Sequence, residues 1–270
     1  MRYNLAVIMS LYKNDMLKYV SLAVQSILNQ TYSEFDFYIQ YDGDVQSDVD
    51  SYLSKIKDER IHIYRRNENK GLARSLNDLL EVIIPLEYKY IARMDADDIS
   101  MPERFEKQIN YLETHSDIDC LGTWAIEITS DGDEFFRKKM PETHEDCWKQ
   151  FMVRDCMIHP SVMFRKSYID KAGFYSLDTY YGEDTMIWAQ GFSKGCKFAN
   201  LPEFLFKFRL NDDFFSRRRG WKHAKGIFTL RCKVNRMLNY PVKAYAYAVA
   251  YAFAKLMPTI VLNQMYKKLR

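Results

Sequence analysis

Glycine, proline and cysteine are all scarce in this sequence. Its 270 residues include 10 Gly and 7 Pro, too few for a low-complexity linker between domains, and no internal repeat is visible. The five cysteines are an odd number and form no C-x-x-C pair, which argues against a disulfide framework or a zinc site and indicates reduced thiols in a cytosolic protein. The first residues, MRYNLAVIMSLY, show no signal-peptide cleavage pattern.

Acidic residues are missing from one part of the chain. Residues 214–270 hold 13 of the 39 Lys and Arg residues and none of the 36 Asp and Glu residues, although the whole chain has a formal net charge of only +3. An acidic body with a basic tail indicates an anionic surface as the partner of the tail. The whole chain, with 47% hydrophobic and 28% charged residues, has the composition of a folded soluble protein.

What the sequence does contain is an alternation of strand-like and helix-like segments. The expected strands cover residues 5–9, 35–41, 61–64 and 88–94, and the expected helices cover 16–30, 72–83 and a segment with Pro102 in its first turn. Beyond residue 120 we expect strands at 120–128 and 162–164 and helices at 142–153 and 184–192. The alternation predicts an α/β fold with a mainly parallel central sheet flanked by helices.

Carboxylates follow two of the expected strands. In a parallel sheet, ligands bind beyond the carboxyl ends of the strands, which is where Asp42 and the D-A-D-D stretch Asp95–Asp98 fall. Carboxylate oxygens suit Mg²⁺ or Mn²⁺, which in turn bind phosphate oxygens. In extended backbone Asp95 and Asp97 share one face and Asp98 turns elsewhere. The alternative interpretation is a solvated acidic turn that caps the helix after Pro102.

Several motifs occur in one order along the chain. They are S-I-L-N-Q-T-Y (26–32), a strand ending in D-G, N-K-G-L-A-R-S-L-N (69–77), Y-I-A-R-M-D-A-D-D-I-S-M-P-E-R (90–104), I-H-P-S-V-M-F-R (158–165) and Y-G-E-D (181–184). Together they resemble the inverting family-2 glycosyltransferases, whose nucleotide-sugar-binding fold is called GT-A. The resemblance covers about residues 3–215. It implies a Rossmann-like GT-A domain over 1–215, divided into a nucleotide-sugar half (1–115) and an acceptor half (116–215), before a basic amphipathic helical tail over 216–270.

The resemblance also implies a donor site for a UDP-sugar. Asp42 matches the uracil-binding aspartate of the family, although Tyr41 replaces the first Asp of the common D-D-G-S pattern. Ser10 and Tyr12 match contacts to the nucleoside, and Arg74 matches a position near the uridine and the sugar. A solvated helix residue is the alternative for Arg74. For the metal, Mn²⁺ or Mg²⁺, the resemblance implies Asp97 as the principal ligand, with Asp95 between the ribose and the metal.

The E-D pair Glu183-Asp184 matches the catalytic base of the family. We favour Asp184 and retain Glu183, because relatives differ in which position has the role; an acidic helix start is the alternative for both. The implied reaction is a single in-line displacement in which the base deprotonates an acceptor hydroxyl, UDP leaves, and an α-linked donor gives a β-linkage.

Four further residues are candidates for contact with the diphosphate or the acceptor. His159 matches the acceptor side of the family site, Arg209 belongs to F-R-L-N where many relatives have Y-R-x-H, and Asn211 replaces the histidine of that motif. Arg217 and its neighbours are suited to phosphate because a guanidinium donates two parallel hydrogen bonds; lipid contact is the alternative. With no H-x-H or H-x-x-x-H, a zinc site is not expected.

The tail contains an apolar stretch over residues 244–262. It has about the length of a membrane span, but Lys255 near its centre and Pro258 oppose one, and its basic flanks favour a helix lying on anionic lipid. A helix packed on the domain is the other alternative. Together with the resemblance, this predicts a peripheral protein on the cytoplasmic face of the inner membrane. The implied acceptor is a lipid-diphosphate-linked saccharide of O-antigen or capsule synthesis, and the transferred sugar is Glc, GlcNAc or Gal.

Two other classes of function compete with this interpretation. A sugar nucleotidyltransferase also uses a parallel sheet, a metal and carboxylates, but LAVIMSLYKND lacks the Gly-rich basic phosphate loop that such enzymes carry. A non-catalytic membrane-surface protein is the second alternative. Nucleic acid is not an expected partner, because the aromatic residues of the tail lie in an Ala-rich helix and not among basic residues on a sheet face.

Overall fold

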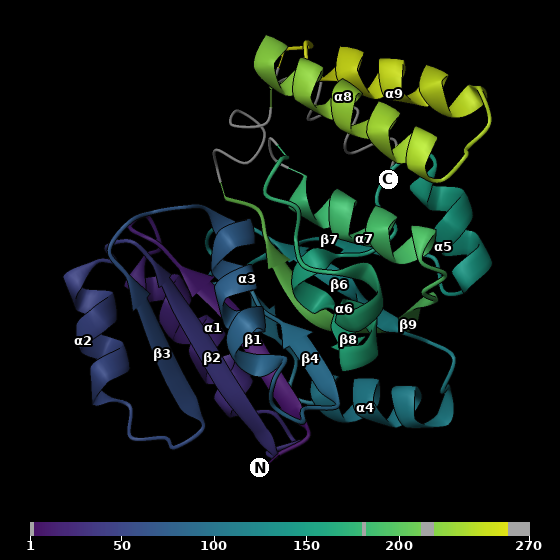
Figure 1. Ribbon diagram of the computed structural model, residues 1–270. Coiled ribbons are helices and arrows are strands. Elements are labelled where there is room, and N and C mark those ends of the chain that lie inside the picture. Colours follow the sequence, from purple (N-terminus) through teal and green to yellow (C-terminus); the bar gives the residue numbers. More distant parts are fainter. Residues whose placement is uncertain (1–2, 180–181, 212–218, 259–270) are drawn as a thin grey trace.

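The computed structural model describes residues 3–179, 182–211 and 219–258. The strands of this part of the chain form one nine-stranded sheet in the order β3-β2-β1-β4-β8-β6-β9-β5, with β7 paired to β6 (Figure 1). The strands are β1 (Leu5–Leu11), β2 (Phe35–Asp42), β3 (Ile61–Arg66), β4 (Tyr90–Arg93), β5 (Ile99–Ser100), β6 (Cys120–Ile128), β7 (Glu134–Lys138), β8 (Met163–Arg165) and β9 (Phe198–Arg209).

Strands β3, β2, β1 and β4 are parallel, as the alternation of strands and helices predicts. The short strand β8 is antiparallel to both β4 and β6, so that β6 again runs in the direction of β4, and β9 is parallel to β6. The sheet is therefore mainly parallel, and the carboxyl ends of β1, β2 and β4 meet at one edge.

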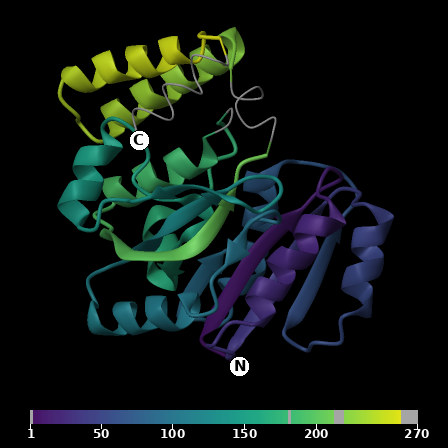
Figure 2. The same ribbon diagram turned by 180° about the vertical axis from the view of Figure 1, so that it is seen from behind.

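Two layers of helices bury the two faces of the sheet. Along β1 the side chains alternate: Leu5, Val7 and Met9 belong to one core cluster, and Ala6 and Ile8 belong to the other, as the two-residue period of a strand requires. The first cluster lies beneath α1 (Leu17–Leu28), α2 (Ser47–Lys55) and α4 (Arg104–Thr114). The second lies beneath α3 (Leu72–Ile83), α5 (His144–Phe151), α6 (Lys166–Ala172) and α7 (Glu183–Ser193), as the two opposite views show (Figures 1 and 2).

Most expected elements are present with similar bounds, and 72–83 and 120–128 agree at both ends. One expectation was wrong: α4 begins at Arg104, so Pro102 lies in the preceding turn and not in the first helical turn. The 12-residue strand β9 was not expected. It contains Pro202, which cannot donate to a ladder, and the pairing with β6 shifts register at this point, between Thr123 and Trp124.

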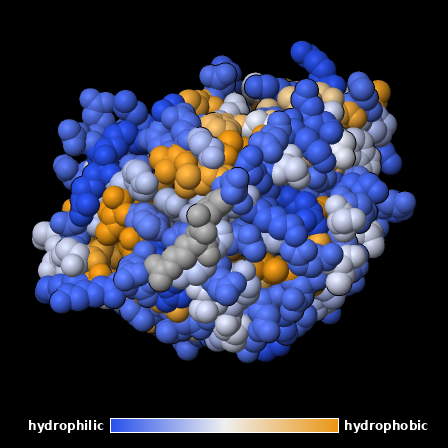
Figure 3. All heavy atoms as spheres, turned by 60° about the horizontal axis from the view of Figure 1, so that its bottom comes forward, coloured by the Kyte–Doolittle hydropathy of each residue, from blue (hydrophilic) through white to orange (hydrophobic). Residues whose placement is uncertain are grey.

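A C-terminal hairpin of α8 (Trp221–Met237) and α9 (Lys243–Ala254) lies across α7 and α5 at the top of Figure 1. Side chains of α8 such as Leu230 and Val234 join the core cluster beneath α7. Helix α9 ends before Pro258, and in the described part of the chain no helix has the length and hydropathy that a membrane span requires. The lower end of the molecule is largely hydrophilic, with apolar side chains in a few patches (Figure 3).

Candidate active site

The carboxyl edge of the parallel strands brings together the residues expected to bind a nucleotide. Asp42 is the last residue of β2, Asp95 follows β4 by two residues, and β1, with Ser10 near its end, pairs with both of these strands. Tyr12 comes directly after β1. Four candidates from three distant parts of the sequence therefore share one edge of the sheet.

The Asp42 carboxylate is buried and held by several donors. It accepts hydrogen bonds from the backbone N–H groups of Lys70 (2.7 Å) and Gly71 (2.9 Å), and it pairs with the guanidinium of Arg66. The next residue, Gly43, has a φ of +77°. Asp42 thus fastens the end of β2 to the loop before α3, and its orientation is fixed before any ligand binds.

Arg66, at the end of β3, was not among the expected site residues. It pairs with Asp78 as well as Asp42 and donates to the Ser75 hydroxyl at 2.9 Å. Arg74 also pairs with Asp78, through Nε at 2.7 Å, in an i,i+4 arrangement on α3. The sequence signal was weak, because Arg66 stands in a basic stretch, R-R-N-E-N-K, that is typical of a solvated loop.

The D-A-D-D stretch divides into two kinds of carboxylate. Asp95 pairs with the buried guanidinium of Arg93, and Asp97 accepts a hydrogen bond from the Asn211 side chain at 2.7 Å. Asp98 is fully buried and accepts the backbone N–H of Arg209 at 2.7 Å. Asp95 and Asp97 are thus the partly exposed members of the stretch, and Asp98 turns into the protein.

Carboxylates gather around this stretch more densely than the sequence suggests. Burial raises the pKa of Asp97, and the neighbouring Asp95 raises it further. Burial also raises the pKa of Asp15 to about 8, against the hydrogen bond from the Tyr12 N–H, and the charges of Asp97 and Asp95 contribute to the rise. Asp15 was missed; its only signal is its place three residues after Tyr12.

This donor set fits a hard divalent cation. A bound cation would stabilise the ionised form of Asp97, whose pKa burial and the charge of Asp95 raise. Mg²⁺ is commonly held by one or two carboxylates together with substrate phosphates. Within the described ranges no group of three or more His, Cys, Asp or Glu side chains is arranged to hold a metal. Asp95 and Asp97 would accordingly supply part of the ligand sphere, with the diphosphate and water supplying the rest.

Other motif residues hold the D-A-D-D loop in place. Gln30 of S-I-L-N-Q-T-Y is buried; its amide donates to Met101 O (2.8 Å) and accepts from Phe105 N (3.1 Å). Arg104, which ends the M-P-E-R segment, is also buried and donates to the carbonyl of Arg93 at 2.9 Å. Burial, and then the charge of Arg93, lower the pKa of Arg104 to about 9. These motifs therefore support the loop from behind.

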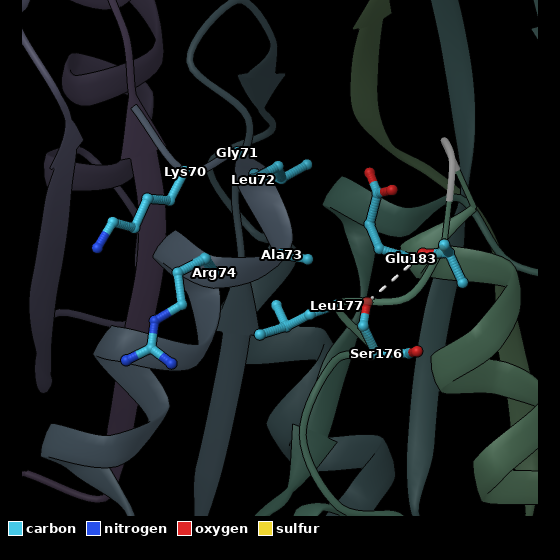
Figure 4. A pocket seen from close by; sticks show the side chains of 9 residues that line it. Lys70, Gly71, Leu72, Ala73, Arg74, Ser176, Leu177 and Glu183 are labelled. Atoms are coloured by element: carbon cyan, nitrogen blue, oxygen red, sulfur yellow. Dashed lines mark hydrogen bonds between the residues drawn. The ribbon is translucent and has the colours of Figure 1, made fainter. Parts of the chain in front are cut away.

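Glu183 and Asp184 form the first turn of α7, where the helix dipole favours negative charge. Glu183 accepts the N–H of Gly182 at 3.1 Å, and Asp184 accepts the N–H of Thr185 at 2.7 Å. Glu183 and Arg74 line one cavity of about 370 Å³ between the starts of α7 and α3 (Figure 4). Its lining consists of Lys70, Gly71, Leu72, Ala73, Arg74, Ser176, Leu177, Thr179 and Glu183.

His159 is tied to the same region through Tyr175. Its Nε2 shares a hydrogen bond of 2.8 Å with the Tyr175 hydroxyl, and the Asn77 side chain binds both the N–H and the carbonyl of Tyr175, each at 2.9 Å. Burial, and then the charge of Arg93, hold the pKa of His159 well below its usual range. His159 is therefore a neutral imidazole at neutral pH.

Arg209 is buried and bound to backbone carbonyls. Its Nε donates to Asp97 O at 2.8 Å, and its Nη1 donates to Thr129 O at 2.9 Å and Ser130 O at 3.1 Å. It therefore braces the D-A-D-D loop, while contact of Arg209 or His159 with the diphosphate or the acceptor stays a prediction. Arg217 lies outside the described residues.

The sequence matches the family model described as "Glycosyl transferase family 2" over residues 6–171. Amylovoran biosynthesis glycosyltransferase AmsE of Erwinia amylovora is 31% identical over 97% of this chain and 98% of its own length. O-antigen biosynthesis glycosyltransferase WbnJ of Escherichia coli is 32% identical, covering 77% of this chain and 80% of its own. An E. coli UDP-Gal:alpha-D-GlcNAc-diphosphoundecaprenol beta-1,3-galactosyltransferase is 27% identical, over 97% and 95%.

Solved structures of similar fold include complexes with nucleotide sugars. TarS 1-349 of S. aureus, in complex with UDP-GlcNAc, superposes with a TM-score of 0.62 at 14% identity, covering 96% of this chain and 83% of that one. The mannosyltransferase PcManGT from Pyrobaculum calidifontis, in complex with GDP-Man and Mn²⁺, gives 0.63 at 14% identity, over 100% and 81%. At these identities the likeness establishes the fold, which is of the GT-A type.

Proposed function

The chain belongs to glycosyl transferase family 2 and is therefore a glycosyltransferase, and from this premise we propose a specific reaction for it. It transfers a hexose or N-acetylhexosamine from a UDP-sugar, with inversion, to a hydroxyl of a lipid-diphosphate-linked saccharide in the synthesis of O-antigen or another polysaccharide. Family membership decides against the nucleotidyltransferase and the non-catalytic alternatives.

One observation carries the proposal: Arg74 and Glu183, matched to the donor site and to the base, line a single cavity although 109 positions separate them in the sequence. A glycosyltransferase must place its donor and its base on opposite sides of the reacting carbon. A cavity that lies between the start of α3 and the start of α7 supports such an arrangement (Figure 4).

The uridine half of the donor would bind at the edge formed by β1 and β2. A carboxylate has about four sites for hydrogen bonds. Asp42 uses sites for Arg66, Lys70 and Gly71, which leaves capacity for the N3–H of uracil. Because the donors around it fix its orientation, Asp42 would discriminate uracil from cytosine, whose ring offers no N–H there. Ser10 and Tyr12 would contact the nucleoside from β1.

Asp97, with Asp95, would hold Mn²⁺ or Mg²⁺. A bound divalent cation would supply charge stabilisation for the diphosphate leaving group. The protein's own part is to keep these carboxylates in place: Asn211 orients Asp97 by a hydrogen bond, and Arg93 orients Asp95 by an ion pair.

Asp184 or Glu183 would take the proton of the acceptor hydroxyl as that oxygen attacks the anomeric carbon. Attack from the face opposite UDP inverts the configuration, so an α-linked donor yields a β-linkage. His159 is not suited to this role, because burial lowers its pKa and so makes it a weak base, and its Nε2 already shares a hydrogen bond with Tyr175.

The relatives and the hairpin support the proposed acceptor and the proposed location of the enzyme. One relative is named for a diphosphoundecaprenol-linked acceptor, and two are named for amylovoran and O-antigen synthesis. On the hairpin, Trp221 and Val242 are 80% and 86% exposed, and each is followed directly by a lysine. Exposed apolar and basic side chains of this kind would hold the enzyme on the cytoplasmic face of the membrane as a peripheral protein. Flotation should then require vesicles that contain anionic lipid; binding to neutral vesicles alone would contradict this.

Calorimetric titration tests the donor site. UDP should bind more tightly with Mn²⁺ than without it, GDP and CMP should bind weakly, and Asp97→Ala should lose the effect of the metal. Asp131→Ala is the matched control, since Asp131 is exposed on a surface turn and pairs only loosely with Lys18, at 3.7 Å. Equal binding of all three nucleotides by folded protein would refute the donor assignment.

A transfer assay tests the base. Asp184→Asn and Glu183→Gln are assayed with UDP-Glc, UDP-Gal or UDP-GlcNAc and GlcNAc-diphosphoundecaprenol. The variant that lacks the base should bind UDP normally and lose turnover by about 10²-fold or more. Normal turnover by both variants would refute the assignment.

A further inference from the structure

The start of α7 is bound to the C-terminal hairpin through a half-buried aspartate, Asp155. The hydroxyl of Thr185, which follows Asp184, donates to both carboxylate oxygens of Asp155, at 2.9 and 3.0 Å. Arg231 of α8 donates to the same carboxylate through Nη2 at 2.9 Å. Asp155 therefore joins the first turn of α7 to the middle of α8.

The Arg231 guanidinium is enclosed by protein. The residue is 2% exposed, its Nη1 donates to Phe151 O at 3.0 Å, and its plane lies near the rings of Phe151 and of Tyr251 on α9. An arginine so placed cannot contact a lipid surface. Loss of the Arg231 charge would leave the Asp155 carboxylate, which also holds Thr185, without its cationic partner.

A second contact connects the same two helices. Gly182, the residue before Glu183, packs so closely on α8 that a Cβ atom there would overlap the Leu230 side chain. Its φ of 168° is ordinary extended backbone, so the constraint is one of space and not of conformation. Leu230 and Arg231 are neighbours on α8, and they restrain the two residues that flank Glu183-Asp184, Gly182 and Thr185.

We propose that Arg231 and Asp155 are positioning residues for the catalytic base, and that the C-terminal hairpin is a working part of the active site. The inference rests on the proposed function, in which Glu183 or Asp184 takes the acceptor proton. A displacement of about 1 Å at a reacting group costs up to about 10²-fold in rate. The uridine site lies on β1, β2 and the loop before α3, so the hairpin acts on turnover and not on UDP affinity.

The test is Arg231→Met, which retains most of the apolar stem and removes the charge. Its matched control is Arg236→Met, the same substitution at an exposed position of the same helix. We expect Arg231→Met to lower kcat by about tenfold or more and to change the Kd for UDP by less than about twofold, with Arg236→Met unchanged in both. A folded Arg231→Met protein with the kcat of wild type overturns the inference.

A second pair of variants keeps the test independent of that buried charge. Gly182→Ala should lower kcat because its methyl group displaces the turn, and Gly182→Ala with Leu230→Ala should restore it by making room. Failure of the double variant to recover any kcat overturns the inference. If wild type transfers no sugar, or if Asp184→Asn and Glu183→Gln both keep full activity, the proposed function fails and the inference falls with it; loss in those two variants with full activity in Arg231→Met refutes the inference alone.

Discussion

Replacement of Gly43 by alanine should destabilise the protein through two separable effects. The φ of +77° at Gly43 is unfavourable for any residue with a side chain. A Cβ atom at this position would also lie 2.8 Å from the backbone N of Asn69, and backbone cannot move aside as a flexible side chain does. Gly43 follows the candidate uracil ligand Asp42, so the change tests the donor site together with the fold.

The magnitude can be divided with a control glycine. The left-handed conformation costs alanine about 1–2 kcal/mol, and overpacking against fixed atoms adds about 1–3 kcal/mol. Gly132 has a φ of +97° with nothing within 4 Å of its would-be Cβ. Gly132→Ala should therefore lose only the first amount, about 1–2 kcal/mol, and Gly43→Ala about 2–5 kcal/mol in total.

Urea unfolding followed by tryptophan fluorescence measures both free energies, and calorimetry measures UDP binding. Asn69 donates to the Asp42 carbonyl at 3.1 Å, and Lys70 and Gly71 donate to its carboxylate. A shift of this loop should weaken UDP binding by about tenfold, a change of about 1.4 kcal/mol, in Gly43→Ala and not in Gly132→Ala. Equal unfolding free energies for the two variants, or unchanged UDP affinity in Gly43→Ala, would refute this reasoning.

Two further predictions concern the support of the acceptor side. Asn77→Ala removes both hydrogen bonds to the buried backbone of Tyr175 and should lower the free energy of unfolding, measured in urea, by about 2–4 kcal/mol. The pKa of His159 is lowered in the folded protein, so on acidification the unfolded chain binds the proton first, and the free energy of unfolding falls as the pH drops through about 6.5. His159→Gln should flatten this part of the stability profile. An unchanged slope would contradict the assignment.

Much of the fold was accessible from local patterns. Apolar runs and helical spacing placed β1, β2, α3 and β6 correctly, because the apolar residues of each segment are the ones that are buried in the structure. Strand β9 was not predicted because Pro202 interrupts its sequence pattern. The shift of register against β6 accommodates that residue.

The candidate site shows the same division. Asp42, Asp95 and Asp97 were found from their place after strands, and Glu183 and Asp184 from a motif. Arg66 and Asp15 were not found, since each acts through residues that are distant in sequence or in another loop.

The sequence by itself determined much of the alternation of strands and helices, the chemical types at the carboxyl ends and the family, because these depend on local spacing and on short motifs. Only the tertiary structure decided which charged side chains are free to contact a ligand or a membrane and which are buried with a partner. In the sequence, Arg231 and Arg209 cannot be told from the exposed basic residues near them. In the structure both are buried: Arg231 binds Asp155, and Arg209 binds backbone carbonyls. Burial and partner geometry arise from packing between distant segments, which no local pattern encodes.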